Sequence, residues 1–206
     1  MGHSHIQKRH KPIMRNNRLK KKPYFTHNHR GFTLLELLVA VAIVAILVTA
    51  VGPSIQSIVI KNRITADINS LSAVAQRARF TAVDEQTEVI LCPTSDYEDC
   101  ETNWSNAKMA FIDRNINGSR DSDETILFTS DPINKANLIY GISGSVAFDE
   151  QGAIDTAATI TICPKDNDAT YASAVILSLF GRISVAVDGN GDGTKEDLSG
   201  SALSCS

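Results

Sequence analysis

The sequence predicts an α+β protein in which one long N-terminal helix packs against antiparallel β-structure. Three observations support this fold class. An apolar run with a single ionisable group covers residues 32–52. Helical periodicity continues from residue 54 to about residue 84. From residue 86 onward, short β-prone runs alternate with turns rich in Asn, Asp, Gly and Ser.

Charge is distributed very unevenly along the 206 residues, whose formal net charge is -3. Residues 1–31 contain nine Lys and Arg, no Asp or Glu, and all five His. The rest of the chain carries 11 Lys and Arg against 23 Asp and Glu. If residues 1–31 are removed, no His remains. That loss excludes Ser-His-Asp catalysis, Cys-His catalysis and His-ligated metal sites in the mature chain.

Residues 32–52 have the length and composition of a membrane-spanning helix. As a helix they rise about 30 Å, which matches the hydrocarbon core of a bilayer. Basic residues precede them and acidic residues follow. The positive-inside rule therefore predicts a cytoplasmic N-terminus and a periplasmic domain after residue 53. The run is longer than the apolar region of a secretory signal, which has roughly 7–15 residues. A plain anchor leaves Glu36 unexplained, because a charge there costs roughly 2.5–3.5 kcal/mol on insertion scales.

The junction RGFTLLELL at residues 30–38 resembles the class III signal of type IV pilins and pseudopilins. The resemblance implies that a prepilin peptidase cuts between Gly31 and Phe32 and that the new Phe32 amine is methylated. It also implies that Glu36 neutralises the Phe32 amine of a neighbouring subunit, which compensates the buried carboxylate. Gly31 suits cleavage because a protease must approach the backbone closely there.

The resemblance also implies a role in filament assembly for Thr33 and Pro53. Pilin-like helices commonly carry a proline at this point, where it kinks or locally unwinds the helix. Met1 and Met14 are both possible starts, because a 31-residue leader is long for such proteins. Four parts are expected: a basic cytoplasmic leader that is removed (1–31), a transmembrane helix (32–52), an amphipathic helix (53–85) and a periplasmic β-rich domain (86–206).

The amphipathic helix and the strands follow from hydrophobic periodicity. Apolar residues recur at spacings of three and four, which is typical of a helix that packs on a sheet. This stripe consists of Ile64, Ile68, Leu71, Ala75, Ala78 and Ala82. Strands are predicted at residues 88–92, 108–113, 125–129, 146–149, 159–163, 174–179 and 183–187.

Four cysteines lie in the part of the chain that the predicted topology exposes to an oxidising periplasm, so disulfides are expected. Three pairings are possible for four cysteines. We favour Cys92 with Cys100, which closes a local loop. The remaining pair, Cys163 with Cys205, then ties the C-terminus to a strand.

The stretches VILCP at 89–93 and FIDRNING at 111–118 resemble the GspH/FimT family of minor pseudopilins and minor pilins. ICP at 162–164 and LFGRI at 179–183 resemble the C-terminal half of that family. The resemblance implies a type IV pilin-like fold and a subunit that primes or caps a filament of a type IV pilus or a type II secretion system. Its implied partners are a prepilin peptidase/N-methyltransferase, other major and minor pilins or pseudopilins, and an inner-membrane assembly platform.

No enzymatic activity is expected, because the mature chain lacks His, a nucleophile motif and a phosphate-binding loop. Members of the family can capture DNA through a basic Gly-Arg-x-Arg segment. Here the aligned residues 181–184 read GRIS, so Arg182 is the remaining nucleic-acid candidate. The residues after 53 carry 11 Lys and Arg against 22 Asp and Glu, a balance that repels phosphate backbones. In the alternative interpretation, Arg182 simply opens a strand after a Gly turn.

One acidic run matches the twelve-residue calcium loop of EF-hands. Strands rather than helices are predicted to flank it, so an acidic hairpin turn is the alternative. A second run begins similarly at Asp188, but Ser199 at its twelfth position cannot supply the bidentate carboxylate. No other cofactor is predicted. The candidate calcium ligands are Asp113, Asn115, Asn117, Ser119, Asp121 and Glu124, with Gly118 at the sixth position.

Overall fold

The structure is a computed structural model that describes residues 31–206, with the backbone alone at residues 50–53. The predicted leader, except Gly31, and both candidate starts lie outside the described residues. Helix α1 (Leu34–Glu85) is 52 residues long and begins two residues later than the apolar run. The chain divides into two units, and the second, Ile46–Ser206, contains the later turns of α1 and every described strand.

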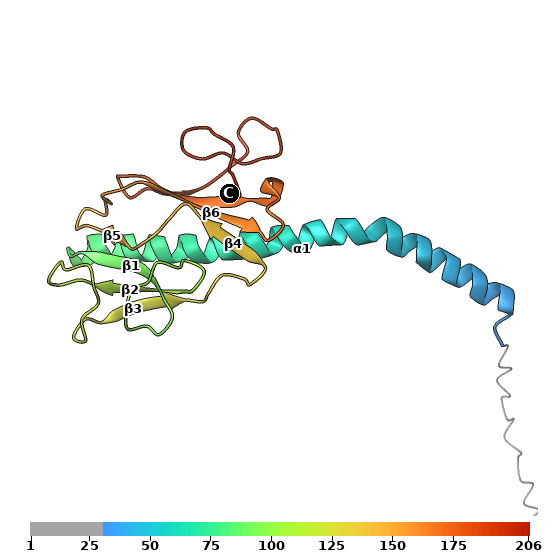
Figure 1. The fold of residues 1–206 in the computed structure, drawn as a ribbon, viewed down its shortest axis with the longest axis horizontal. Helices are drawn as coiled ribbons and strands as arrows, with labels where there is room; N and C mark the ends of the chain where they lie inside the picture. Colours follow the sequence, from blue (N-terminus) through green and yellow to red (C-terminus); the bar gives the residue numbers. More distant parts are fainter. Residues whose placement is uncertain (1–30) are drawn as a thin grey trace, which may run out of the picture. The chain divides into compact units, whose positions relative to one another are not determined.

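Eight strands form two antiparallel four-stranded sheets, in the orders β3-β2-β1-β5 and β4-β6-β7-β8. In Figure 1 the sheet that contains β1, β2 and β3 lies on one side of the later turns of α1, and β6 lies on the other. The strands are β1 (Val89–Thr94), β2 (Ala107–Ile112), β3 (Ile126–Ser130), β4 (Asn137–Tyr140), β5 (Val146–Phe148), β6 (Ala158–Pro164), β7 (Ser173–Leu177) and β8 (Ile183–Val185), with a short 3-10 helix, η1 (Ala169–Tyr171), before β7.

The apolar stripe of α1 forms the centre of the core, as its periodicity predicts. Each of its six residues is at most 2% exposed. The stripe packs against both sheets, including Phe148 of β5, Ile162 of β6 and Leu177 of β7. Burial of this apolar surface stabilises the domain by roughly 25 cal/mol per Å².

Trp104 fixes the loop before β2 to the same core. Its side chain is 1% exposed and belongs to the cluster around α1. Its indole Nε1 donates a hydrogen bond of 2.8 Å to the Gly144 carbonyl oxygen, just before β5. A buried indole N–H needs such an acceptor, so this bond fixes the orientation of the ring.

Seven of the strands correspond to the predicted ones, and the structure adds β4. This strand was missed because it has only four residues, begins with Asn137 and shows no alternation of polar and apolar side chains. It pairs with β6, and the register places Leu138 opposite Cys163 and Ile139 opposite Ile162.

Both favoured disulfides are present. Cys92 is joined to Cys100, and Cys163 is joined to Cys205. The first staples the loop after β1 to that strand. The second fixes the C-terminal segment to β6 within a separate small core that also contains Leu203 and Ile176.

Replacing both cysteines of a pair by serine is expected to destabilise the domain unequally. The Cys163–Cys205 bond spans 42 residues and the Cys92–Cys100 bond spans 8. In the chain-entropy model, loss of the longer link costs about 4 kcal/mol and loss of the shorter about 2.5 kcal/mol. Urea unfolding of the detergent-solubilised chain measures both, with the short-loop double variant as the matched comparison. Equal losses would contradict the entropic account.

Candidate functional site: assembly motif, acidic loops and basic groove

The N-terminal motif is organised by Thr33, which caps α1. Its Oγ1 accepts a hydrogen bond of 3.1 Å from the Glu36 backbone N–H, and its carbonyl oxygen accepts one from Leu37 N. Thr33 and Glu36 have the spacing of a capping box, a signal that the sequence analysis did not use. The cap satisfies a backbone donor of the first turn, so the helix can begin at Leu34, directly after Thr33.

The first turns of α1 expose a continuous apolar surface. Phe32 is 83% exposed, and the large apolar side chains of residues 34–48 are each about half exposed or more. Surfaces of this kind mark contact with a membrane or a protein partner. Within residues 31–206, no single helix satisfies the length and hydropathy criteria for a membrane span. The segments Leu34–Thr49 and Ser54–Glu85 satisfy them only as a pair, by length and composition.

The predicted calcium loop at residues 113–124 is closed by its own backbone donors. Asp113 is buried, and its carboxylate accepts hydrogen bonds from Asn117 N and Gly118 N. Glu124 is also buried and accepts from the N–H groups of residues 114 and 121. Asp121 instead accepts from the side-chain amides of Asn115 and Asn117. The structure therefore uses these side chains to shape the turn.

Glu124→Gln is expected to weaken this turn whether or not calcium is present. The amide offers one acceptor oxygen where the carboxylate offers two, so the N–H of Arg114 or Asp121 loses its partner. An unsatisfied buried donor costs about 1–3 kcal/mol. Urea unfolding in the presence of a chelator measures the loss. Asp123→Asn, an exposed change in the same loop, is the control and should have little effect.

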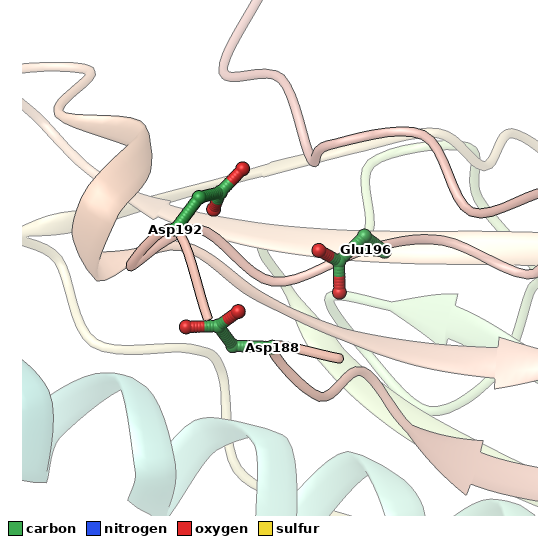
Figure 2. Close-up of side chains that lie close together, drawn as sticks. All are labelled: Asp188, Asp192 and Glu196. Carbon is green, nitrogen blue, oxygen red and sulfur yellow. The ribbon is translucent and has the colours of Figure 1, made fainter. Parts of the chain in front are cut away.

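A second acidic loop, at residues 188–196, brings three carboxylates together. Ligand oxygens of Asp188, Asp192 and Glu196 lie within 4.8 Å of one another (Figure 2). Glu196 Oε2 accepts a hydrogen bond from Gly189 N, whereas Oε1 is buried without a hydrogen-bond partner. Exposed acidic groups of this kind are common without an ion. The calcium-loop pattern does not point to Glu196, because it places the bidentate carboxylate at position twelve and Glu196 is the ninth residue.

Lys108 is a buried cation that the sequence analysis did not single out. It lies in β2 and is 2% exposed. Burial lowers the pKa of its ammonium group to about 8, and the nearby Asp67 carboxylate opposes this shift. Asp67 accepts hydrogen bonds from Asn134 N and from the side-chain amide of Asn137. A lysine within an otherwise apolar strand, AKMAFI, was the available signal.

Arg182 lies in an exposed turn between β7 and β8. Gly181 precedes it with a φ of +66°, and β8 begins at Ile183. This geometry agrees with the interpretation that the arginine opens a strand after a Gly turn. The fold also places Arg182 beside Arg77 and Arg79 of α1, in one groove. Sequence spacing could not show this, because about a hundred residues separate the helix from the turn.

These features define a class of protein. The exposed apolar start of α1, its capped Thr-Glu motif and two antiparallel sheets packed on its later turns are the architecture of a pilin-like subunit. The family model for the type II transport protein GspH matches residues 67–181, and the chain belongs to this family. A second model, the prokaryotic N-terminal methylation motif, matches residues 26–52. The chain is thus a minor pilin or pseudopilin, a structural subunit for assembly of a pilus-like filament.

One solved structure supports this fold, and a second is reported beside it. The type IV minor pilin FimU of Pseudomonas aeruginosa is 18% identical, with a TM-score of 0.50 over 61% of this chain and 90% of that one. The minor pseudopilin EpsH of the Vibrio cholerae type 2 secretion system is 11% identical, covers 62% of this chain and 99% of that one, and has a TM-score of 0.47. At 18% identity, the likeness to FimU establishes the fold alone. No curated protein matches the chain. The predicted fold class and family are confirmed.

Proposed function

We propose that the chain is a prepilin that is cut between Gly31 and Phe32, methylated, and inserted into a filament as a priming or tip subunit. Residues 1–31 are then the cytoplasmic leader, 32–52 the span of the inner membrane and 53–85 the amphipathic helix. Residues 86–206 form the periplasmic domain. The observation that carries the proposal is one carboxylate, Glu36, on an exposed apolar helix that begins directly after the cleavage motif.

The chemistry of assembly follows from that carboxylate. Glu36 is the single ionisable group of residues 32–52. In an apolar surrounding its charge is tolerated when a cation pairs with it. The free amine that cleavage creates at Phe32 of a neighbouring subunit is such a cation. Pairing both anchors a new subunit and sets its axial register.

The partners follow from this route. A prepilin peptidase/N-methyltransferase processes the leader, and an inner-membrane platform lifts the subunit out of the bilayer. Other major and minor pilins or pseudopilins surround α1 in the filament. The chain itself supplies no nucleotide site motif, so the energy for assembly comes from other components of the machine.

A strain lacking this gene tests the proposal directly. We expect loss of surface pili, restored by a plasmid copy, since the two disulfides and the motifs around them favour the pilus branch. Normal pili with impaired release of secreted enzymes would assign the chain to a type II secretion system instead. Normal pili and normal secretion would overturn the assembly role.

Calcium remains a prediction for the two acidic loops. A bound ion stabilises the folded state by mass action, so calcium binding at either loop predicts that millimolar calcium raises the melting temperature of the chain relative to a chelator. The loop at 188–196 is the better candidate, since its carboxylates converge, and Glu196→Gln should remove the effect. If Glu124→Gln removes it instead, the loop at 113–124 holds the ion. Equal melting temperatures would exclude both.

A further inference from the structure

We infer that a groove between the last turns of α1 and the β7–β8 turn binds an acidic, apolar-faced segment of a neighbouring filament subunit. The inference rests on the proposed function, because it names one contact of an assembled subunit. The groove has a volume of about 880 Å³. It lies wholly within the unit formed by residues 46–206.

The wall formed by the turn is fixed against the helix before any partner arrives. A Cβ at position 181 would lie 1.6 Å from the Gly152 carbonyl oxygen, so only glycine fits there. The same oxygen accepts a hydrogen bond of 2.9 Å from Arg79 Nε. Within the turn, Ser178 Oγ accepts one of 3.1 Å from Arg182 N. A preformed wall loses little conformational entropy on binding.

The groove is basic although the surrounding domain is acidic. Its lining carries Arg77, Arg79 and Arg182, and none of its described lining residues is Asp or Glu. Residues 53–206 contain 11 Lys and Arg against 22 Asp and Glu, so over a quarter of their cations gather here. The Arg77 guanidinium also lies 4.7 Å from the centre of the Phe128 ring. Guanidinium groups pair with carboxylates in a fixed geometry, so the complementary partner is acidic.

Exposed apolar side chains adjoin the arginines. Phe80 lines the groove and is 69% exposed, and Phe180 at the turn is 84% exposed. Phe180 and Leu179, the latter 51% exposed, belong to the turn that forms the wall and do not line the groove themselves. A cluster of large apolar residues with arginine is typical of the centre of a protein interface. The partner therefore presents an apolar residue together with its carboxylates.

Single-stranded DNA is the competing occupant, since bases stack on aromatic rings and arginines bind phosphates. Its backbone carries a charge at every nucleotide, however, and would extend over the acidic surface beyond the groove. A short protein segment brings its few carboxylates only to the three arginines. The charge distribution therefore favours a protein.

Site-specific photocrosslinking tests the inference in the full-length chain, expressed in its own bacterium. A photoreactive phenylalanine analogue replaces Phe180, an exposed residue at the rim of the groove that directly precedes the lining residue Gly181. The same analogue at Leu198, which is 66% exposed and lies outside the groove, is the control. We expect position 180 to crosslink to an acidic segment of another subunit with the N-terminal methylation motif, identified by peptide mass spectrometry. Position 198 should not yield that product. A DNA adduct, or equal products from both positions, would overturn the inference.

Charge variants provide the second measurement. Arg182→Glu should lower the yield of the position-180 crosslink about tenfold, whereas Arg182→Lys should retain most of it. Arg114→Glu, at an exposed arginine outside the groove, is the matched control and should leave the yield unchanged. An unchanged yield in Arg182→Glu would refute the charge pairing.

Fractionation separates this inference from the function on which it rests. If cleaved chain is absent from sedimented filaments, the proposed function fails. If the chain is present there and position 180 gives no product with an acidic subunit segment, the docking inference alone fails.

Discussion

Glu36→Ala is expected to leave cleavage after Gly31 intact and to remove the chain from filaments. In the proposed assembly, this change leaves the Phe32 amine of the neighbouring subunit without its partner in an apolar surrounding. Breaking a buried ion pair from one side costs about 3–5 kcal/mol. At roughly 1.4 kcal/mol per tenfold, incorporation should fall by about 100-fold or more. Immunoblots of sheared filaments and of membranes measure the two outcomes.

Two further variants isolate the charge. Glu36→Gln keeps the shape of the side chain and should fail as completely as alanine. Glu85→Ala, at the other end of α1, removes an exposed carboxylate and should assemble normally. Normal filament levels of Glu36→Ala would contradict the pairing role.

Gly31→Leu is expected to block processing and every later step. The packing of the described residues does not require this glycine, because none of their atoms beyond its chain neighbours lies within 4 Å of the position of an added Cβ. In the proposed processing, the requirement arises when the peptidase approaches the backbone, and a branched side chain would obstruct that approach. Intact mass of the membrane-bound chain distinguishes the uncut from the cut form.

Gly31→Ala is the matched control for that experiment. A single methyl group obstructs the protease little, so cleavage should continue. Efficient cleavage of Gly31→Leu would show that the peptidase tolerates size at this position. The glycine would then need another explanation.

The long helix and its buried face could be predicted because they depend on local periodicity. Ile64 and Ala78 repeat at helical spacing, and the structure buries both. The division into two sheets could not be predicted, because it depends on pairing between distant segments. Strand β1 pairs with β5 more than fifty residues later, so that Val89 lies opposite Phe148. No local pattern specifies that contact.

The candidate sites were predictable only where one short motif carries the chemistry. The N-terminal methylation motif is contiguous, so it could be recognised from sequence, and the roles of Gly31, Phe32 and Glu36 within it stay predictions. In the loop at 113–124 the spacing of oxygen ligands was recognised, but hydrogen bonding to the backbone was not. Glu196 comes to lie beside Asp188 because its N–H donates a hydrogen bond of 3.1 Å to the Val187 carbonyl oxygen. The groove could not be predicted from sequence, because its walls, α1 and the β7–β8 turn, come together only in the folded chain.

Trp104 gives the protein an intrinsic optical probe. It is the only tryptophan of the chain, and its indole is sealed between the helix and the strands. Separation of α1 from the sheets would transfer this ring from an apolar surrounding to water and shift its fluorescence to longer wavelengths. The unfolding of each variant can therefore be followed without an added dye. The signal reports the helix–sheet contact on which the domain depends.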